Sequence, residues 1–252
     1  MKQLVAFDLD GTLAESKQPL DAHMAACLRS LLDLALVSVI SGGDWKQFET
    51  QVIARLPADA DLGRLFIMPT TGAKLYRFVE GGWRQIYAET FTAAERGQIL
   101  TALERAVDDA GVRPDKLWGP QIEDRGTQIT FSALGQQAPI DAKKGWDPDQ
   151  AKRIALQRQL VTQLPGFSIR IGGTTSLDIT REGVDKAYAI DRLIEHAAVP
   201  REAMLFFGDA IYPGGNDDPV RAAGVDSVRV RDPAETAAIL ESLIAWNRPL
   251  PG

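Results

Sequence analysis

Short apolar runs and amphipathic stretches alternate along the first third of the chain, and this pattern predicts strands followed by helices. The run LVAFD at 4–8 predicts a strand, because branched and aromatic apolar residues dominate it. Behind Asp21, apolar residues recur at helical spacing, so we expect a helix capped by that aspartate. The run LVSVI at 36–40 predicts a second buried strand. The elements expected next are a helix over 47–56, a strand at the start of 65–78 and the start of another strand at its end.

The middle of the chain, from about 84 to 184, has a different character. Two helices alternate there with strand-like segments, which favours a small α+β unit. From Lys186 onward, helical and buried apolar segments alternate again. The expected fold class is therefore α/β, with a parallel-sheet core over 1–82 and 185–252 and an inserted α+β domain over 83–184. The later elements expected are helices at 92–110, about 148–164, 186–197 and 233–246, and strands within 117–134, 167–180, 203–209 and 225–230.

The two crossings between these domains are expected near 81–86 and 181–186. Gly81, Gly82 and Gly183 are suited to act as hinges there. The alternative is that these glycines serve only tight turns.

Length and composition are those of an ordinary globular chain, with 252 residues, 45% hydrophobic and 25% charged. The formal charge of −6 argues against a broad nucleic-acid surface but allows a small basic pocket, so we expect small-molecule partners. Cys27 is the one cysteine, which excludes an intrachain disulfide. The apolar stretches are too short to cross a bilayer and no secretory signal is visible, so a cytoplasmic protein without a membrane partner is the expectation.

The decapeptide LVAFDLDGTL at 4–13 carries most of the candidate chemistry. Asp8 and Asp10 stand two positions apart at the end of the apolar run, and Gly11 permits a turn that brings both carboxylates round one point. Two anions that close repel each other unless a cation lies between them. A hard divalent ion with oxygen ligands resolves this repulsion, so the sequence predicts Mg²⁺ as cofactor.

Two further segments place phosphate-suited groups next to apolar runs. Ser41, Gly42 and Gly43 offer a hydroxyl and backbone amides to phosphate oxygens, although a Ser-Gly-Gly turn is by itself usually an ordinary loop. Lys186 opens a predicted helix, where its ammonium and the helix N-terminus together suit a phosphate, and a solvated surface lysine is the alternative. The carboxyl ends of parallel strands meet at one crevice, so these distant segments can come together.

The segment GDAIYPGGNDD at 208–218 supplies more acidic groups. Asp209 ends an apolar strand, where an unpaired carboxylate is costly, so we expect it to bind the metal. Asn216, Asp217 and Asp218 lie in a glycine-rich loop that either folds back towards the same ion or forms an exposed acidic turn. Of the two aspartates, Asp217 is the expected ligand.

Together these groups are the parts that phosphoryl transfer needs. Asp8 is the candidate nucleophile, because a carboxylate attacks phosphorus without a prior deprotonation and forms an aspartyl phosphate. Asp10 is the candidate acid and base for the leaving and attacking oxygens. Lys186 is the candidate fixed cation, and Ser41 with its glycines is the candidate phosphate cradle.

In their order along the chain, these motifs resemble the phosphotransferases of the haloacid dehalogenase (HAD) superfamily, subfamily IIB. Eukaryotic-type phosphomannomutases are the most similar members. The resemblance spans the chain and is carried by DLDGTL, the Ser-Gly motif, Lys186 and three longer segments. Those segments are IEDRGTQITFSALG (122–135), GGTTSLDITREGVDKAYAI (172–190) and LFFGDAIYPGGNDD (205–218).

This resemblance implies a Rossmann-like core and an inserted cap that closes over a sugar phosphate. It also implies that the carboxylates of the core surround Mg²⁺, and that two copies pair through their caps. The metal ligands expected in all are Asp8, Asp10, Asp209 and Asp217. The cap residues implied to contact substrate are Arg125, Ser176 and Asp178, of which the arginine suits a phosphate through its planar fork.

The chain also departs from the family pattern. Gln136 stands where the family has a cap arginine for the distal phosphate, and Lys143 or Lys144 lies near a second such arginine. A neutral glutamine cannot neutralise a phosphate, and a lysine lacks the fork. The loop after Asp217 is shorter than in the family, and the serine of SGGD is displaced relative to the family's Gly-Gly-Ser-Asp.

These departures from the family pattern lead us to rank three possible functions. Weakened capture of the distal phosphate favours a Mg²⁺-dependent phosphatase that acts on a phosphorylated sugar or a similar small metabolite. The second function is a phosphomannomutase that interconverts hexose 6-phosphate and hexose 1-phosphate, with lysines in place of arginine. The third is a non-catalytic phosphosugar-binding protein, against which the retained Asp8, Asp10, Lys186 and Asp209 argue.

Overall fold

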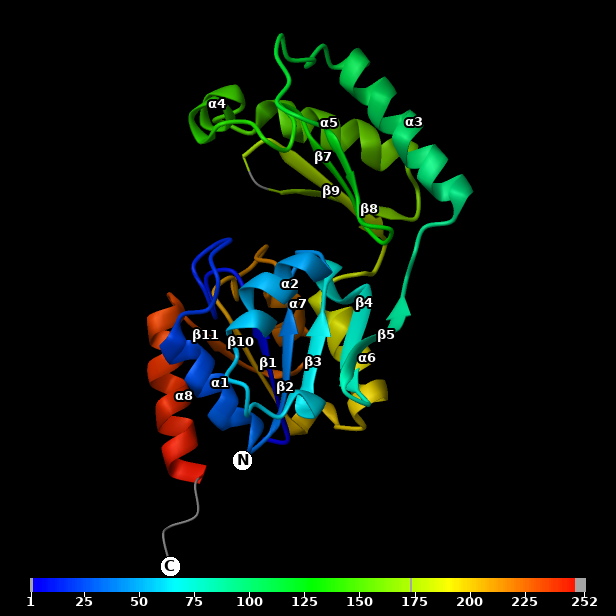
Figure 1. Ribbon diagram of the computed structural model, residues 1–252. Helices are drawn as coiled ribbons and strands as arrows, with labels where there is room; N and C mark the ends of the chain where they lie inside the picture. The colour runs from blue at the N-terminus through cyan, green and yellow to red at the C-terminus, as the bar shows by residue number, and fades with distance from the viewer. Residues whose placement is uncertain (1, 173, 248–252) are drawn as a thin grey trace, which may run out of the picture. The chain divides into compact units, whose positions relative to one another are not determined.

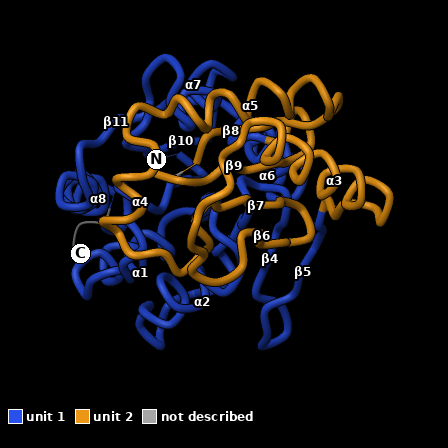
Figure 2. The backbone as a smooth tube through the Cα atoms, turned by 90° about the horizontal axis from the view of Figure 1, so that it is seen from above, with its two compact units in different colours: residues 1–88, 185–252 blue, residues 89–184 orange. Residues whose placement is uncertain are grey.

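The computed structural model describes residues 2–172 and 174–247 and divides the chain into two compact units. Unit 1 comprises residues 1–88 and 185–252, and unit 2 comprises residues 89–184 (Figure 2). Within the described residues, no helix combines the length and the apolar character of a bilayer-spanning segment.

Unit 1 is built on a seven-stranded sheet with the order β11-β10-β1-β2-β3-β4-β5 (Figure 1). The first five strands in this order are parallel, whereas β4 and β5 are antiparallel. The helices and strands of unit 1 are β1 (Leu4–Asp8), α1 (Ala22–Leu32), β2 (Leu36–Ile40), α2 (Trp45–Gln51), η1 (Ile53–Arg55), η2 (Leu62–Arg64), β3 (Leu65–Met68), η3 (Thr70–Gly72), β4 (Lys74–Val79), β5 (Gly82–Ala88), α6 (Lys186–Ala197), η4 (Arg201–Ala203), β10 (Met204–Gly208), α7 (Asp218–Ala222), β11 (Asp226–Arg229) and α8 (Pro233–Asn247).

Helices cover both faces of this sheet at its centre, which explains why β1, β2 and β3 are almost continuous apolar runs. Side chains alternate between the faces along each strand. On β1, Val5 and Phe7 pack in one core with α1 and α8, while Leu4 and Ala6 pack in the other core with α6 and α7. The Asp21 carboxylate accepts a hydrogen bond from the Met24 backbone N–H at 2.7 Å, so it caps α1 as predicted.

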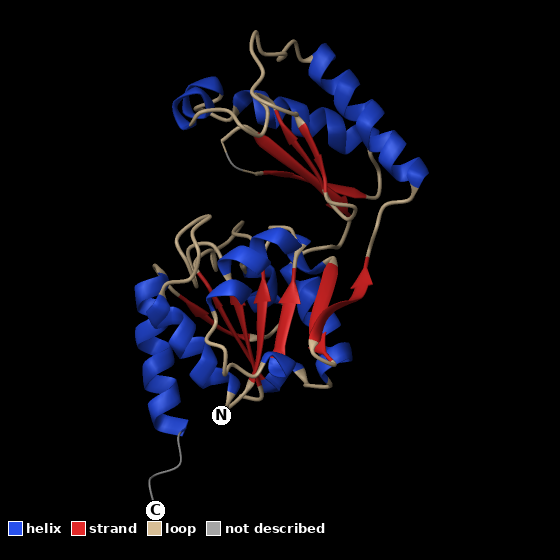
Figure 3. Ribbon diagram, in the orientation of Figure 1, coloured by secondary structure: helices blue, strands red, loops and turns tan. Residues whose placement is uncertain are grey.

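Unit 2 is a four-stranded antiparallel sheet with the order β6-β7-β9-β8. One of its faces packs against the helices α3 and α5 in an apolar core, to which Leu177 and Ile179 of β9 contribute (Figure 3). The neighbouring positions Ser176 and Asp178 fall on the other face, because side chains alternate along a strand. The elements of unit 2 are α3 (Ala93–Asp109), β6 (Ile122–Asp124), β7 (Ile129–Ser132), α4 (Ile140–Trp146), α5 (Ala151–Gln163), β8 (Phe167–Ile171) and β9 (Ser176–Arg181).

The first boundary between the units differs from the expected one. The sequence placed it after residue 82, whereas unit 1 continues to residue 88, because β5 pairs with β4 along its whole length. Gly81 and Gly82 belong to the tight turn of this hairpin, with Gly82 paired to Val79, so the hinge interpretation is wrong for these two glycines. The second boundary lies at 184/185, next to Gly183, whose hinge role stays a prediction.

Gly72 offers a test of how tightly η3 packs on α6. Its φ is +87°, and a Cβ placed there would lie 2.4 Å from the Ala189 Cβ and 2.9 Å from the Ala189 Cα. We expect Gly72→Ala to lower the free energy of unfolding by about 2 to 4 kcal/mol, because a left-handed residue and an overpacked contact both cost stability. Chemical denaturation of the purified variant measures this loss.

Gly224 provides the matched control. It has the same φ of +87°, but a Cβ there meets no atom within 4 Å. Gly224→Ala should therefore cost about 1 kcal/mol, the backbone contribution alone. Equal losses in the two variants would show that the Gly72 contact is not a tight one.

Candidate active site

The candidate site lies at the carboxyl edge of the parallel strands of unit 1. The neighbouring strands β10, β1 and β2 end at Gly208, Asp8 and Ile40, and Asp209 and Ser41 follow directly. After β1 the chain continues to β2 on one side, and it returns through β10 on the other side. Such a reversal of strand order opens a crevice at the strand ends, where ligands of open α/β sheets bind.

A buried ammonium joins two carboxylates at this edge. Lys186 donates from Nζ to Asp8 Oδ1 at 2.5 Å and also to Asp217 Oδ1. The three residues are 1%, 5% and 0% exposed, so the whole group is shielded from water. Lys186 is placed by the start of α6, where the Asp185 carboxylate caps the helix by accepting the backbone N–H groups of Ala187 and Tyr188.

Burial and charge set the protonation of these groups. Burial raises the pKa of the Asp8 carboxyl from 3.8 to about 6, although the nearby Lys186 ammonium partly offsets this effect by favouring the ionised form. Burial alone would lower the pKa of Lys186, but the Asp8 and Asp217 carboxylates raise it above its usual value, so the lysine stays charged. Burial and the Asp217 carboxylate raise the pKa of Asp209.

Three carboxylates converge here on a space that suits a hard cation. Asp8, Asp209 and Asp217 each offer an oxygen, and these oxygens all lie within 4.8 Å of one another. One ammonium cannot balance three carboxylates, so the ionised group carries an excess negative charge at a largely buried position. Carboxylate oxygens are the donors that Mg²⁺ prefers, so these residues fit the expected ion.

Asp10 lies next to this group rather than in it. Its Oδ1 accepts the Lys17 backbone N–H at 2.7 Å, and its Oδ2 accepts the Gln47 amide at 3.3 Å. Gly11 closes the turn with a φ of +88°, and a Cβ there would lie 2.6 Å from Asp209 Oδ2. The glycine thus lets Asp209 come close to the β1 turn, whereas the ligand role of Asp10 stays a prediction.

The other acidic and phosphate-suited residues predicted in unit 1 lie after β10 and after β2. Asp218 pairs with Arg221 at the surface, so the loop at 216–218 turns only Asp217 into the group. Ser41 is buried beyond the end of β2, and its Oγ accepts the Gly43 backbone N–H at 3.3 Å. Gly42 is the exposed residue of this turn, and the phosphate role of Ser41, Gly42 and Gly43 stays a prediction.

Unit 2 presents a polar sheet face opposite its apolar core. Asp178 Oδ1 accepts the Thr130 hydroxyl at 2.6 Å and the Gln128 amide at 3.1 Å, and Ser176 shares a hydrogen bond with Ser132 at 3.1 Å. These bonds fix two of the three predicted substrate residues in one row across β7 and β9. A row of fixed hydroxyls and a carboxylate matches the hydroxyl groups of a sugar.

Two arginines belong to this polar part of unit 2. Arg125 makes a two-pronged pair with Glu123, with both N···O distances 3.0 Å, so its planar fork is held in one orientation. Arg170 on β8 is the register partner of Asp178 on β9, on the same face. Sequence reasoning missed Arg170, although its place between Ile169 and Ile171, which pack towards the core, was a usable signal.

The chain matches a known protein family over most of its length. The profile of the family described as eukaryotic phosphomannomutase matches residues 24–246. The chain belongs to the eukaryotic phosphomannomutase family. Phosphomannomutase 1 of Homo sapiens is 27% identical over 227 residues, which cover 85% of this chain and 81% of that protein. Phosphomannomutase 1 of Mus musculus is 26% identical over 227 residues, covering 87% and 83% respectively.

The fold is shared more widely. A haloacid dehalogenase-like hydrolase from Bacteroides thetaiotaomicron is similar with a TM-score of 0.68 and 16% identity, over 96% of this chain and 100% of that one. This likeness confirms the α/β fold with a mostly parallel sheet. The range matched by the phosphomannomutase family includes Lys186, Asp209, Asp217 and all of unit 2, and it begins after Asp8 and Asp10.

Members of this family were expected to place a cap arginine where Gln136 stands. In the structure Lys143 of α4 lies beside this residue, since its Nζ donates to the Gln136 backbone carbonyl at 3.3 Å. The Gln136 Nε2 is buried without a hydrogen-bond partner in the part of the chain that the structure describes. An ammonium therefore lies beside Gln136, where the sequence alone suggested a loss of anion binding.

The raised pKa of Asp8 predicts a pH effect on the metal-free protein. The folded state binds the Asp8 proton more tightly than the unfolded state, with a pKa of about 6 against 3.8. Stability from this protonation is present in full below the unfolded pKa and is lost as the pH rises through about 6. The free energy of unfolding, relative to that of Asp8→Asn, should therefore fall across this range by up to about 3 kcal/mol.

Urea denaturation of both proteins with a chelator present, from about pH 4 to about pH 8, measures this difference. Asn keeps the size of the side chain but does not titrate, so it isolates the contribution of Asp8. A difference that stays constant, or that rises with pH, would contradict the assignment of the raised pKa to Asp8.

Proposed function

We propose that this chain is a phosphomannomutase that interconverts hexose 6-phosphate and hexose 1-phosphate through an aspartyl phosphate on Asp8. The observation that carries the proposal is the buried contact of Asp8 with Lys186 and Asp217, in a chain that the phosphomannomutase family profile matches over 24–246. The relatives named phosphomannomutase support the transferase over the phosphatase that the sequence analysis ranked first.

Asp8 is the nucleophile in this proposal. One carboxylate oxygen attacks the phosphorus of a hexose bisphosphate, the bond from phosphorus to the sugar oxygen breaks, and that oxygen takes a proton from Asp10. The aspartyl phosphate then transfers its phosphoryl group to the free hydroxyl of the next hexose monophosphate, and Asp10 removes the proton of that hydroxyl. The bisphosphate that forms turns round and gives its other phosphoryl group to Asp8, so the sugar leaves as the isomeric monophosphate. The Lys186 contact at 2.5 Å holds Asp8 in position and stabilises its ionised form.

The cofactor is proposed to be Mg²⁺. Asp8, Asp209 and Asp217 would hold it, because their oxygens form the acidic group described above. A bound Mg²⁺ supplies positive charge that screens the carboxylates from the phosphate oxygens.

Unit 2 is proposed to bind the sugar phosphate. Ser176 and Asp178 are fixed by their neighbours and suit sugar hydroxyls, and the oriented fork of Arg125 suits a phosphate. Lys143 supplies a further positive charge beside Gln136, where the family carries arginine. This placement supports a mutase with a lysine in the role of an arginine.

The deciding experiment supplies mannose 1-phosphate, Mg²⁺ and a catalytic amount of hexose bisphosphate. We expect hexose 6-phosphate to form without a stoichiometric release of inorganic phosphate. Asp8→Asn should lower this rate at least about a thousandfold while leaving the fold intact, because the anionic nucleophile is gone. Coupled detection of hexose 6-phosphate, with a parallel phosphate assay, measures both reactions.

Asp218→Asn is the matched control, since Asp218 is a neighbouring aspartate that pairs with Arg221 at the surface. It should keep its rate within about twofold. Prompt release of phosphate without isomerisation would contradict the mutase proposal.

The second candidate function, a HAD-type phosphatase, is favoured by one observation. Gln136 brings no charge of its own to the expected distal-phosphate position, so this position relies on the single ammonium of Lys143. A weakly held intermediate leaves the enzyme, and water then accepts the phosphoryl group instead of the sugar.

Substitutions at the adjacent residues Lys143 and Lys144 test how the phosphoryl group divides between water and the sugar. Lys143→Ala should raise the KM for hexose bisphosphate by about tenfold, the effect of one charge-assisted hydrogen bond, and should increase the fraction of phosphoryl groups released to water. Lys144 is exposed, so Lys144→Ala should change both quantities by less than about twofold. Equal effects of the two substitutions would argue that the contact with Gln136 plays no part in binding.

A further inference from the structure

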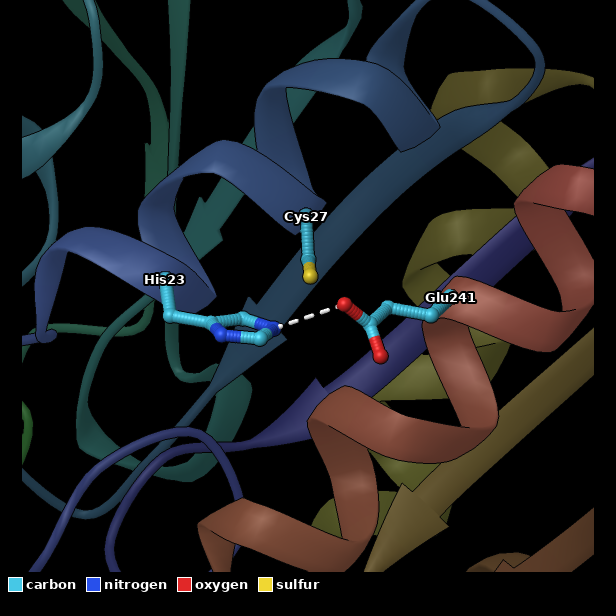
Figure 4. Close-up of side chains that lie close together, drawn as sticks. All are labelled: His23, Cys27 and Glu241. Atoms are coloured by element: carbon cyan, nitrogen blue, oxygen red, sulfur yellow. Dashed lines mark ion pairs between the residues drawn. The ribbon is translucent and has the colours of Figure 1, made fainter.

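A second group of metal-suited side chains lies between two helices of unit 1 and shares no residue with the carboxylates described above. His23 and Cys27 are four positions apart on α1, so they lie on one face of that helix, and Glu241 comes from α8. One ligand atom from each of the three lies within 4.8 Å of the other two. Figure 4 shows the three side chains directed towards one another across the helix pair.

The three side chains differ in burial in a way that suits capture of an ion. Cys27 is 6% exposed, whereas the side chains of His23 and Glu241 are 57% and 59% exposed. The buried thiol fixes one point of the site, and the two exposed groups have room to adjust. The Glu241 and Asp21 carboxylates lie near the Cys27 sulfur, so its surroundings are negative and attract a cation.

The separations are close to those around a tetrahedral metal ion. With Zn²⁺ bond lengths of about 2.0 to 2.3 Å, the ligand atoms of a tetrahedral site lie about 3.4 to 3.6 Å apart. The His23 Nε2 to Glu241 Oε1 distance is 3.1 Å, and every separation in the group is below 4.8 Å. Side-chain adjustments of about 1 Å would therefore complete the geometry.

The site can be reached from solvent. A cavity of about 580 Å³ and a second cavity of about 540 Å³ adjoin it, and His23 and Glu241 line both. Cys27 lines the second cavity. Water can therefore supply a fourth ligand, and an ion can enter without unfolding of either helix.

We propose that His23, Cys27 and Glu241 bind a transition-metal ion of the Zn²⁺ class, which links α1 to α8. A thiolate, an imidazole and a carboxylate are the donors that Zn²⁺ takes in proteins, whereas Mg²⁺ prefers oxygen ligands alone. The bound ion connects two helices whose ligands stand at positions 23, 27 and 241 of the sequence, and it therefore stabilises unit 1. This proposal does not depend on the reaction proposed above.

Cobalt spectroscopy tests the site directly, because Cys27 is the one cysteine of the chain. The reduced, metal-free protein is titrated with Co²⁺, and the thiolate-to-cobalt charge-transfer band is recorded together with the visible bands of tetrahedral Co²⁺. We expect the charge-transfer band to saturate at one ion per chain and to be lost when Zn²⁺ displaces Co²⁺, and we expect a rise in melting temperature with Zn²⁺ of about 3 °C or more. Cys27→Ala should abolish the charge-transfer band.

Variants at the exposed ligands keep the test informative if Cys27→Ala folds poorly. His23→Gln and Glu241→Gln should each weaken Co²⁺ binding by about tenfold or more and remove the thermal shift. The matched control is His196→Gln, since His196 is the other histidine of the chain and stacks on Tyr87 instead. Both His196→Gln and Asp8→Asn should keep the band and its affinity.

The contrary results are equally clear. Visible cobalt bands without a charge-transfer band in the wild-type protein would place the ion away from Cys27 and overturn the proposal. A charge-transfer band that persists at unchanged affinity in His23→Gln and Glu241→Gln would show binding by the thiol alone, and would also overturn it.

Discussion

The structure of unit 1 depends on the contact of one buried ammonium with two buried carboxylates. Lys186 lies between Asp8 and Asp217, and Asp209 adds a third carboxylate to the group. The Lys186 ammonium is the cation of this contact, so removing it would leave Asp8 and Asp217 as uncompensated charges at buried positions, which is far more costly than at the surface. The excess negative charge of this group suits the binding of a cation. These four side chains bring together the ends of β1 and β10, the start of α6 and the loop before α7.

Side chains alternate between the two faces of the strands in both sheets, but the two sheets differ in how many of their faces are apolar. In the centre of unit 1 both faces of the sheet are apolar and covered by helices, so the candidate site residues Asp8 and Asp209 lie at the strand ends. In unit 2 one face is apolar and covered, while the other carries Ser176, Asp178 and Arg170. The parallel sheet of unit 1 thus presents polar groups at its carboxyl edge, whereas the antiparallel sheet of unit 2 presents them on one face. This contrast suits a division of work between group transfer and recognition.

Much of the fold followed from local patterns, and the exceptions have physical causes. The apolar runs that became β1, β2 and β10 predicted both the parallel sheet and the meeting of Asp8 with Asp209, because strand ends converge. The strand β5 carries exposed residues on the sheet edge, so it lacked the apolar signature of its neighbours. The partner of Lys186 and the contact between Lys143 and Gln136 depend on how distant elements pack, which no spacing in the sequence encodes.

The discontinuity of unit 1 has a consequence for the order of folding during synthesis. β10 lies directly between β11 and β1, so the central sheet stays incomplete until residue 229 has left the ribosome. Unit 2 is one continuous segment, 89–184, and all of its strands emerge earlier. The inserted unit can therefore reach its final form while the surrounding one still exposes the apolar flank of β1. During this interval Asp8 lacks its contact with the Lys186 ammonium, which is encoded 178 residues later. Nascent chains that pause there are candidates for chaperone binding.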